Sequence, residues 1–323
     1  MKILVISPDK SDIANVRCYT DVWSHYLCRE LEARGVELVY SPMMDGAGLS
    51  SQEAVEYHRA LPLMGADHIL ALGLRYFSRF PNEVARVLRS RISGALTQFH
   101  DHYIASPNGV DALFHVVKSA AATGAKLGVG NGVHIGWAAD EMICCPHQSL
   151  MELTLLIDHP YYGNVDQDWS RNILLDAQRF VLSGDWQSRW ENVRVRRIID
   201  GGVEDVSIVE RDVPAFHRRH VSFARIVQDY STAHVFLPTH REAVGLSVLE
   251  LALCGALIVT PQGFIPRDRL ATVRSITYTA TVPWGEVLKQ IDVQASRALA
   301  LESSWETVGW KVWEFFRFFK RSS

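Results

Sequence analysis

Short runs of almost uniformly apolar residues recur along the chain, and most are followed by polar residues and then by a stretch of helical periodicity. The first run is Lys2–Ser7, and after it come a helical pattern over Tyr19–Ala33, a stop at Gly35 and a second run at Val36–Tyr40. Strands buried on both faces read as continuous apolar runs, and a strand–helix–strand order is typical of a parallel crossover. The pattern therefore predicts an α/β fold with parallel sheets covered by helices.

The same alternation of strand-like runs and helical patterns continues through both halves of the chain. In the first half the further strand-like runs are His68–Leu72, Gly94–Phe99, Asp111–Lys118 and Lys126–Val129. In the second half they are Leu153–Asp158, Val193–Ile199, Ala233–Pro238 and Ala256–Pro261, with helical patterns over about 169–183, 222–231 and 247–254. Residues 137–150 read as irregular chain. Because 323 residues suffice for two domains of about 150 residues each, we expect two α/β domains joined near residue 148.

Net charge, apolar run length and cysteine content argue against a nucleic-acid-binding, secreted or membrane-spanning protein. Lysine and arginine total 33 against 36 aspartates and glutamates, so the net charge of −3 argues against an overall nucleic-acid-binding field. The apolar start of the chain is too short for a signal peptide, and no run reaches the ~18 apolar residues of a membrane span. The five cysteines form no CxxC pair, which favours a reducing, cytoplasmic setting. The adjacent Cys144 and Cys145 are either metal ligands or small buried residues, and we favour the second interpretation.

The segment Phe236–Gly255 contains the strongest candidate for a ligand-binding site. A strand ends at Pro238, a polar loop follows, and Gly245 permits a tight turn into a helix whose first N–H groups are free. A helix N-terminus beside the carboxyl end of a strand is an anion site suited to a diphosphate. Glu242 precedes this helix and Glu250 lies within it, so their carboxylates can accept hydrogen bonds from sugar hydroxyls on either side of the phosphate. The segment therefore predicts a ligand with hydroxyls flanking a phosphate.

The pair Glu242-x7-Glu250, with Cys254-Gly255-Ala256 after it, resembles the EX7E motif of retaining GT-B glycosyltransferases, particularly family 4. The residues before it, Val227–Pro238, resemble that family's approach to the motif, with His234 where aspartate is commoner and where the residue is not a ligand contact. Four other stretches resemble the family less specifically: residues 2–40, His100-Asp101, residues 135–146 and Ser303–Glu306.

The resemblance implies a fold and a reaction. It implies two Rossmann-like domains facing across a cleft: residues 1–148 on the acceptor side, residues 149–302 binding the nucleotide-sugar, and a helix over 303–323 crossing back to the first domain. It also implies metal-independent transfer of a sugar from a nucleotide-sugar donor to an acceptor hydroxyl, with retention of configuration and without a cofactor. The acceptor stays open: a glycan, a lipid, a small molecule, a protein or modified DNA.

The roles of five residues follow from the same resemblance. Glu242 would lie beside the donor sugar, and Glu250 would bind the ribose hydroxyls of the nucleotide. The N–H groups near Gly245, Leu246 and Ser247 would hold the phosphates and stabilise the departing nucleoside diphosphate.

Three further residues are site candidates, two of them because the sequence departs from the family. His100 would contact the sugar or the acceptor side. The family's Gly-Gly loop is replaced by Asn15–Cys18, where Arg17 could substitute a guanidinium for backbone contacts to phosphate. The family's Arg and Lys after the first strand of the second domain are missing from Asp158–Gly163, and Arg171 is the nearest cation downstream.

Several alternatives stay open beside this interpretation. Glu242 and Glu250 could be ordinary solvated carboxylates, and the chain could be a nucleotide-sugar epimerase or a GT-B binding or scaffold protein without turnover. Six arginines could form a basic face or simply a solvated surface: Arg194, Arg196, Arg197, Arg211, Arg218 and Arg219. The aromatic and basic C-terminal segment 310–321 could make peripheral contact with a membrane, or bury its aromatic side chains against the first domain, which we favour.

Overall fold

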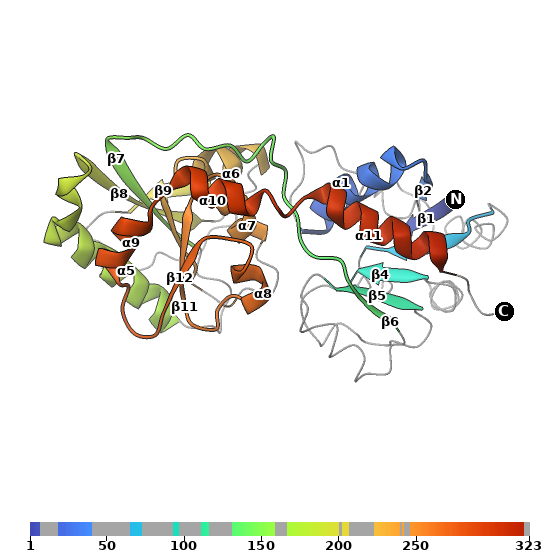
Figure 1. The fold of residues 1–323 in the computed structure, drawn as a ribbon. Helices are drawn as coiled ribbons and strands as arrows, with labels where there is room; N and C mark the ends of the chain where they lie inside the picture. The colour runs from blue at the N-terminus through green and yellow to red at the C-terminus, as the bar shows by residue number, and fades with distance from the viewer. Residues whose placement is uncertain are drawn as a thin grey trace, which may run out of the picture. The chain divides into compact units, whose positions relative to one another are not determined.

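The computed structural model describes residues 1–6, 19–40, 65–72, 93–96, 111–115, 131–158, 167–199, 202–206, 223–239, 241 and 246–319. The chain divides into two compact units (Figure 1). The first unit consists of Met1–Trp137 together with Trp305–Ser323, and the second of Ala138–Ser304. Each unit has its own six-stranded sheet, and the apolar runs predict its α/β class but not its number of strands.

The described strands of the first unit are all parallel and lie in the order β2-β1-β3-β4-β5-β6. They are β1 (Lys2–Ile6), β2 (Glu37–Tyr40), β3 (His68–Ala71), β4 (Gly94–Leu96), β5 (Ala112–His115) and β6 (Asn131–His134). Its described helices are α1 (Tyr19–Ala33) and α11 (Trp305–Phe318). The final helix therefore belongs to the same unit as the N-terminal strands, and its buried aromatic residues help to build that core.

Helices α1 and α11 pack closely against each other. The ring of Trp305 lies edge-on to Trp23 at 4.8 Å and stacks on Tyr26 at 5.2 Å between ring centroids. At the same crossing Gly309 faces Glu30, whose Cβ would lie only 2.5 Å from a Cβ added to the glycine. Side chains interdigitate at such crossings, so the absence of a side chain at Gly309 sets how near the two helices can approach.

We expect the substitution Gly309→Ala to destabilise the protein by about 1–3 kcal/mol, because the new methyl group overpacks the α1–α11 crossing. A matched control is Gly285→Ala, since nothing lies within 4 Å of an added Cβ at that exposed helical glycine. The control should be neutral or stabilising by up to about 1 kcal/mol, because alanine favours the helix. Urea unfolding of both variants measures the difference, and equal effects would contradict the close crossing.

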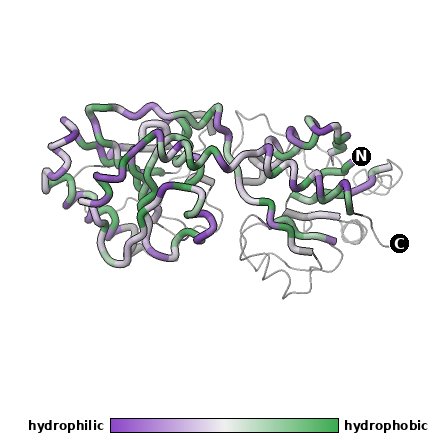
Figure 2. Tube along the Cα trace, in the orientation of Figure 1, coloured by the Kyte–Doolittle hydropathy of each residue, from purple (hydrophilic) through white to green (hydrophobic). Residues whose placement is uncertain are grey.

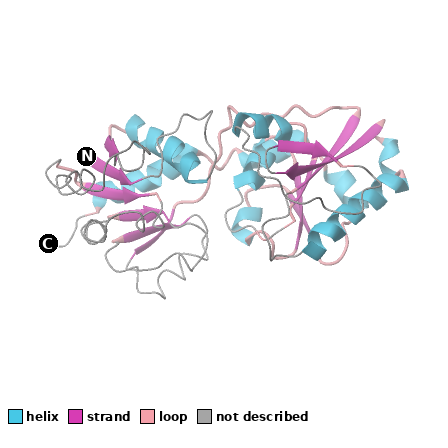
Figure 3. Ribbon diagram, turned by 180° about the vertical axis from the view of Figure 1, so that it is seen from behind, coloured by secondary structure: helices cyan, strands magenta, loops and turns pink. Residues whose placement is uncertain are grey.

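The sheet of the second unit has the order β12-β11-β10-β7-β8-β9, parallel except for β9, which is antiparallel to β8. Its strands are β7 (Glu152–Ile157), β8 (Asn192–Ile199), β9 (Gly202–Asp205), β10 (Val235–Leu237), β11 (Leu257–Pro261) and β12 (Ser275–Tyr278). The helices drawn around it in Figure 3 are α5 (Gln167–Ser183), the 3₁₀ helix η6 (Asp185–Ser188), α6 (Phe223–Tyr230), α7 (Leu246–Leu253), α8 (Arg267–Leu270), α9 (Trp284–Gln290) and α10 (Val293–Ala300).

The structure moves the boundary between the two units towards the N-terminus. The first unit ends at Trp137, whereas the sequence suggested residue 148. The reason is that residues 138–148 bond to the second unit. The Gln148 amide donates to the carbonyl oxygens of Ala233 and Cys254, at 2.8 and 2.5 Å, and Arg297 donates to the Glu141 carbonyl at 3.0 Å.

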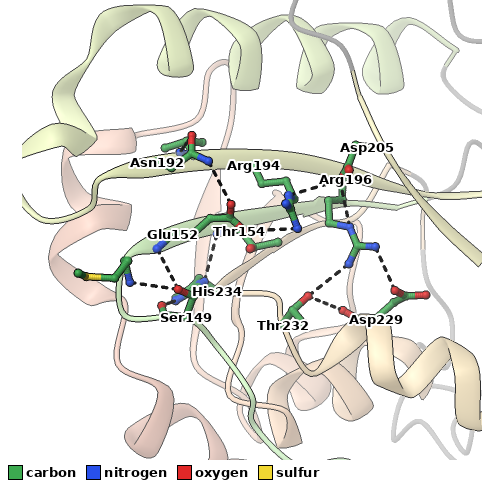
Figure 4. A network of polar contacts seen from close by, with 12 residues as sticks. Ser149, Glu152, Thr154, Asn192, Arg194, Arg196, Asp205, Asp229, Thr232 and His234 are labelled. Carbon is green, nitrogen blue, oxygen red and sulfur yellow. Dashed lines mark hydrogen bonds and ion pairs between the residues drawn. The ribbon is translucent and has the colours of Figure 1, made fainter.

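A polar network holds β7, β8, β9 and α6 together at the start of the second unit (Figure 4). Arg196 donates to Asp229 at 3.0 Å and to Thr232 at 3.3 Å, and its Nε lies 3.4 Å from Asp205. Arg194 lies 3.4 Å from Glu152 and 3.7 Å from Asp205. Both arginines are paired with carboxylates of the same unit, so their charges are offset within this network.

His234, in the same network, uses both of its ring nitrogens. Nδ1 accepts from the Thr154 N–H at 3.1 Å, and Nε2 lies 3.0 Å from the Ser149 carbonyl, to which a neutral ring donates. Burial lowers the pKa of His234 to about 4. The residue that stands where the family has aspartate is therefore a structural link between the start of β7 and β10.

His234 makes the protein sensitive to acid. Its pKa is about 4 in the folded state against 6.5 when unfolded, so the unfolded chain takes up a proton first as the pH falls, and stability is lost from about pH 6.5 down to about pH 4. By pH 5 the loss due to this residue is about 2 kcal/mol. We expect His234→Asn to lower stability at pH 7.5 but to flatten its decline towards pH 5. The control is His147→Asn at an exposed position, which should keep the wild-type dependence of stability on pH, measured by urea unfolding. If His234→Asn and His147→Asn showed the same dependence on pH, His234 would not be the source of the acid sensitivity.

Candidate functional site

The sheet order of the second unit marks where a ligand would bind. From β7 the chain continues on one side to β8 and β9, and it then returns to place β10, β11 and β12 on the other side. The order therefore reverses between β7 and β10, whose last residues, Ile157 and Leu237, are neighbours across the sheet. In open α/β sheets, ligands bind outside the carboxyl ends of the strands at this reversal.

Two buried polar residues, Asp158 and Thr239, lie at this edge of the sheet. Asp158 follows β7 directly, is buried, and donates its backbone N–H to the Leu237 carbonyl at 2.9 Å. Thr239, also buried, lies two residues beyond β10. The next described helix after β10 is α7, which begins at Leu246. The first N–H groups of a helix have no partner within the helix and carry partial positive charge, which makes this edge suited to an anion.

Glu250 lies on α7 just beyond the first turn and is only 6 % exposed. Burial raises the pKa of its carboxyl group to about 8. The carboxyl group is therefore mostly protonated at neutral pH in the ligand-free protein, and it can both donate and accept a hydrogen bond. Its surroundings include the thiol of Cys144, whose pKa is raised by a hydrogen bond with Cys254, by burial and by the charge of Glu250. Cys144 is a fully buried free thiol, as expected for a small apolar residue, whereas its neighbour Cys145 is a free thiol that is only half-buried.

Arg297, on α10, holds α7 against the segment that opens the second unit. Its guanidinium donates to the carbonyl of Leu253 at 2.6 Å, to the carbonyl of Glu141 at 3.0 Å, and to the carbonyl of Cys144. Because Leu253 ends α7 and Cys144 lies near Glu250, this contact fixes the side of the helix that carries the carboxyl group. Sequence reasoning missed Arg297, since its partners are backbone carbonyls far away in the chain and leave no motif.

The predicted site residues divide into those that the structure describes and those outside it. Glu242, His100, Gly245 and Arg17 lie outside the described residues. Glu250, Leu246 and Ser247 come together on α7, where Leu246 is the first residue and Ser247, half-buried, is the second. Arg171 has an exposed side chain on α5, the first described helix after β7.

The first unit holds a histidine pair that the sequence analysis did not single out. His115 ends β5 and His134 ends β6, and the two are partners across the parallel strands. His115 is fully buried, and burial, followed by the nearby His134, lowers the pKa of His115 to about 4. The sequence signal for this pair is a histidine at the end of each of two neighbouring strands. It could not be used, because the residues of β6 do not form an apolar run and the strand was therefore not predicted.

Within the described ranges, no group of three or more histidine, cysteine, aspartate or glutamate side chains is placed to hold a metal ion. None of the described helices is long and apolar enough to cross a membrane.

No protein-family model matches this chain, and no curated protein matches it in sequence. Solved structures do match. A sucrose-phosphate synthase from Thermosynechococcus elongatus superposes with a TM-score of 0.58 at 12% identity, covering 98% of each chain. A glycosyltransferase from Rickettsia africae gives a TM-score of 0.55 at 8% identity over 98% of this chain and 97% of the other. Anabaena HepE, solved in complex with UDP and glucose, gives 0.55 at 12% identity over 99% and 100%.

These similarities show the fold of the chain. They extend over nearly the whole of each protein, and with the two α/β units they confirm the expected GT-B fold. Membership of family 4 and the EX7E motif stay predictions.

Proposed function

We propose that this protein is a retaining glycosyltransferase that moves a sugar from a nucleotide-sugar donor to an acceptor hydroxyl. The observation that carries the proposal is Glu250, a buried carboxyl group on α7, the first described helix after β10, and β10 borders the reversal point of a Rossmann-like sheet. Among the described residues Glu250 has no ion-pair partner, and a buried carboxyl group in such surroundings is costly, so its presence favours a ligand that bonds to it. HepE, of similar fold, was solved with UDP and glucose, which supports a nucleotide-sugar as the donor.

The residues of α7 would then act on the two ends of the donor. Glu250 would bind the ribose hydroxyls, while the N–H groups at Gly245, Leu246 and Ser247 would hold the diphosphate. Glu242 would lie beside the sugar. In the reaction the bond between the anomeric carbon and the diphosphate oxygen breaks, the acceptor oxygen bonds to the same face of the sugar, and the acceptor proton leaves with the nucleoside diphosphate.

The negative charge that develops on the leaving diphosphate needs stabilisation. Preorganised N–H donors at a helix N-terminus supply it, so the proposal requires neither a metal ion nor a cofactor. Arg171 and Arg17 are proposed to add guanidinium contacts to the phosphates, and His100 to contact the sugar or the acceptor. Closure of the site would exclude water, which otherwise hydrolyses the donor.

A thermal-shift screen with UDP-, GDP- and TDP-sugars tests the proposal. We expect one nucleotide class to raise the melting temperature of the wild type and to have no effect on Glu250→Ala, because the ribose contact is lost. The exposed Glu302, changed to Ala, is the matched control and should keep the shift. No shift with any donor would contradict the proposal, and a shift without sugar release to any acceptor would favour a binding or scaffold protein.

A further inference from the structure

The final helix, α11, has one face committed to the core and another that carries large exposed aromatic side chains. Its buried residues are Trp305, Val308, Gly309, Val312 and Phe316. On the other side Trp310 is 46 % exposed and Phe318 is 68 % exposed. Figure 2 shows hydrophobic and hydrophilic residues alternating along this helix. Since the helix is already anchored by its buried face, the exposed aromatic residues are not needed to hold it in place.

Basic side chains accompany these aromatic residues. The guanidinium of Arg317 lies 4.9 Å from the ring centroid of Trp313 and 5.4 Å from that of Phe318. Lys311 is on the same helix, and the sequence continues with Lys320 and Arg321. The acidic residues of the helix are Glu306 in its first turn and Glu314. The C-terminal end is therefore the basic one.

A hollow adjoins the exposed aromatic residues. It has a volume of about 420 Å³ and is lined by Val133 of β6 and by Lys311, Glu314, Phe315, Phe318 and Phe319. Its lining is mostly apolar, and it lies open to the surface. An open apolar surface with a charged rim is characteristic of an interaction site.

We propose that this aromatic face of α11, made of Trp310, Trp313, Arg317 and Phe318, seats the protein on the surface of an anionic lipid bilayer. Tryptophan and phenylalanine side chains partition into the interface between headgroups and acyl chains, and arginine and lysine pair with headgroup phosphates. The guanidinium of Arg317 lies close to both rings, so its charge can meet the headgroups at the level where the rings insert. Charge complementarity thus favours a bilayer that contains anionic lipid, with the helix lying in the plane of the interface.

Flotation of the full chain with lipid vesicles tests this proposal. We expect binding to vesicles of phosphatidylcholine with phosphatidylglycerol, weaker binding to phosphatidylcholine alone, and weakening of the first by salt. The double variant Trp310→Ser/Phe318→Ser should bind at least about tenfold more weakly, because two inserted aromatic side chains are lost. Arg317→Glu should lose only the preference for anionic vesicles. The control is Leu182→Ser, a 74 % exposed leucine on α5 of the second unit, which should bind as the wild type does.

Absence of flotation with the anionic vesicles would overturn the proposal, as would an equal loss in the Leu182→Ser control. Self-association that is abolished by Trp310→Ser/Phe318→Ser, without vesicle binding, would instead make a second copy of this chain the occupant. All altered side chains are exposed, so the melting temperature and the shift caused by nucleotide-sugars should stay unchanged in these variants. That separation keeps this test independent of the proposed transferase activity.

Discussion

Replacing Glu250 with glutamine is expected to stabilise the ligand-free protein at pH 8 by on the order of 4 kcal/mol and to abolish stabilisation by the donor. The carboxyl group has a pKa of about 8 in the folded protein, because burial disfavours its charged form, against 4.5 in a solvated carboxyl group. The unfolded chain therefore loses this proton above about pH 4.5, while the folded protein keeps it up to about pH 8. Stability falls as the pH rises across this window, and glutamine, which never ionises, removes the loss.

Urea unfolding at pH 5 and pH 8 measures the effect. The wild type should lose stability between pH 5 and pH 8 relative to Glu250→Gln, and the difference between them should shrink to about 1 kcal/mol at pH 5. The exposed Glu302, changed to Gln, controls for the removal of a carboxylate and should follow the wild type. A Glu250→Gln protein that is less stable than the wild type at pH 8 would mean that the carboxylate is ionised and paired in the folded state.

The same variant tests what the buried carboxyl group is for. A residue that weakens the ligand-free fold is retained when it serves a function, so a gain in stability together with a loss of binding is the signature of a functional site. Glu250→Gln should therefore melt higher than the wild type at pH 8 without ligand and show no shift with the donor. If the variant were more stable but its melting temperature rose with the donor as much as that of the wild type, Glu250 would be buried as described but would not bind the donor.

The sequence predicted the inner strands, the edge strand β2 and the long helices well, and the other described edge strands poorly. The helical periodicity over Tyr19–Ala33 coincides with α1, and the apolar run Ala256–Pro261 contains β11. Three strands that the pattern did not indicate, β6, β9 and β12, each lie at the edge of a sheet. An edge strand pairs on one side only and is less buried, so polar residues interrupt its apolar run and the signal is lost.

The part of the candidate site that lies in one local segment could be predicted from the sequence, and the part that depends on distant residues could not. Glu250, Leu246 and Ser247 belong to one local segment, so spacing along the chain places them on one helix. The burial of Glu250 depends on residues such as Cys144, more than a hundred positions earlier, and the Arg297 contacts depend on carbonyl groups brought together only by the fold. No spacing in the sequence records such contacts, so the pKa of Glu250 and the role of Arg297 required the structure.

The substitution Trp305→Ala is expected to destabilise the first unit by about 3–5 kcal/mol and to lower its melting temperature by roughly 10 °C. Trp305 begins α11, is 5 % exposed and contacts the rings of both Trp23 and Tyr26 on α1. Truncation would leave a cavity between the two helices at the point where the C-terminal segment joins the N-terminal strands in one unit. Both contacts are aromatic pairs, which add to the stability supplied by burial alone.

Two matched variants separate packing from the mere loss of an indole. Within the described part of the chain the buried Nε1 of Trp305 has no hydrogen-bond partner, so Trp305→Phe keeps an aromatic ring without losing a bond and should cost less than about 1.5 kcal/mol. Trp310→Ala removes an indole from the exposed side of the same helix and should change stability by about 0.5 kcal/mol at most. Urea unfolding followed by far-UV circular dichroism gives the three values. If Trp305→Ala cost no more than Trp310→Ala, α11 would not be held by its aromatic contacts with α1, because only the buried indole fills space between the helices.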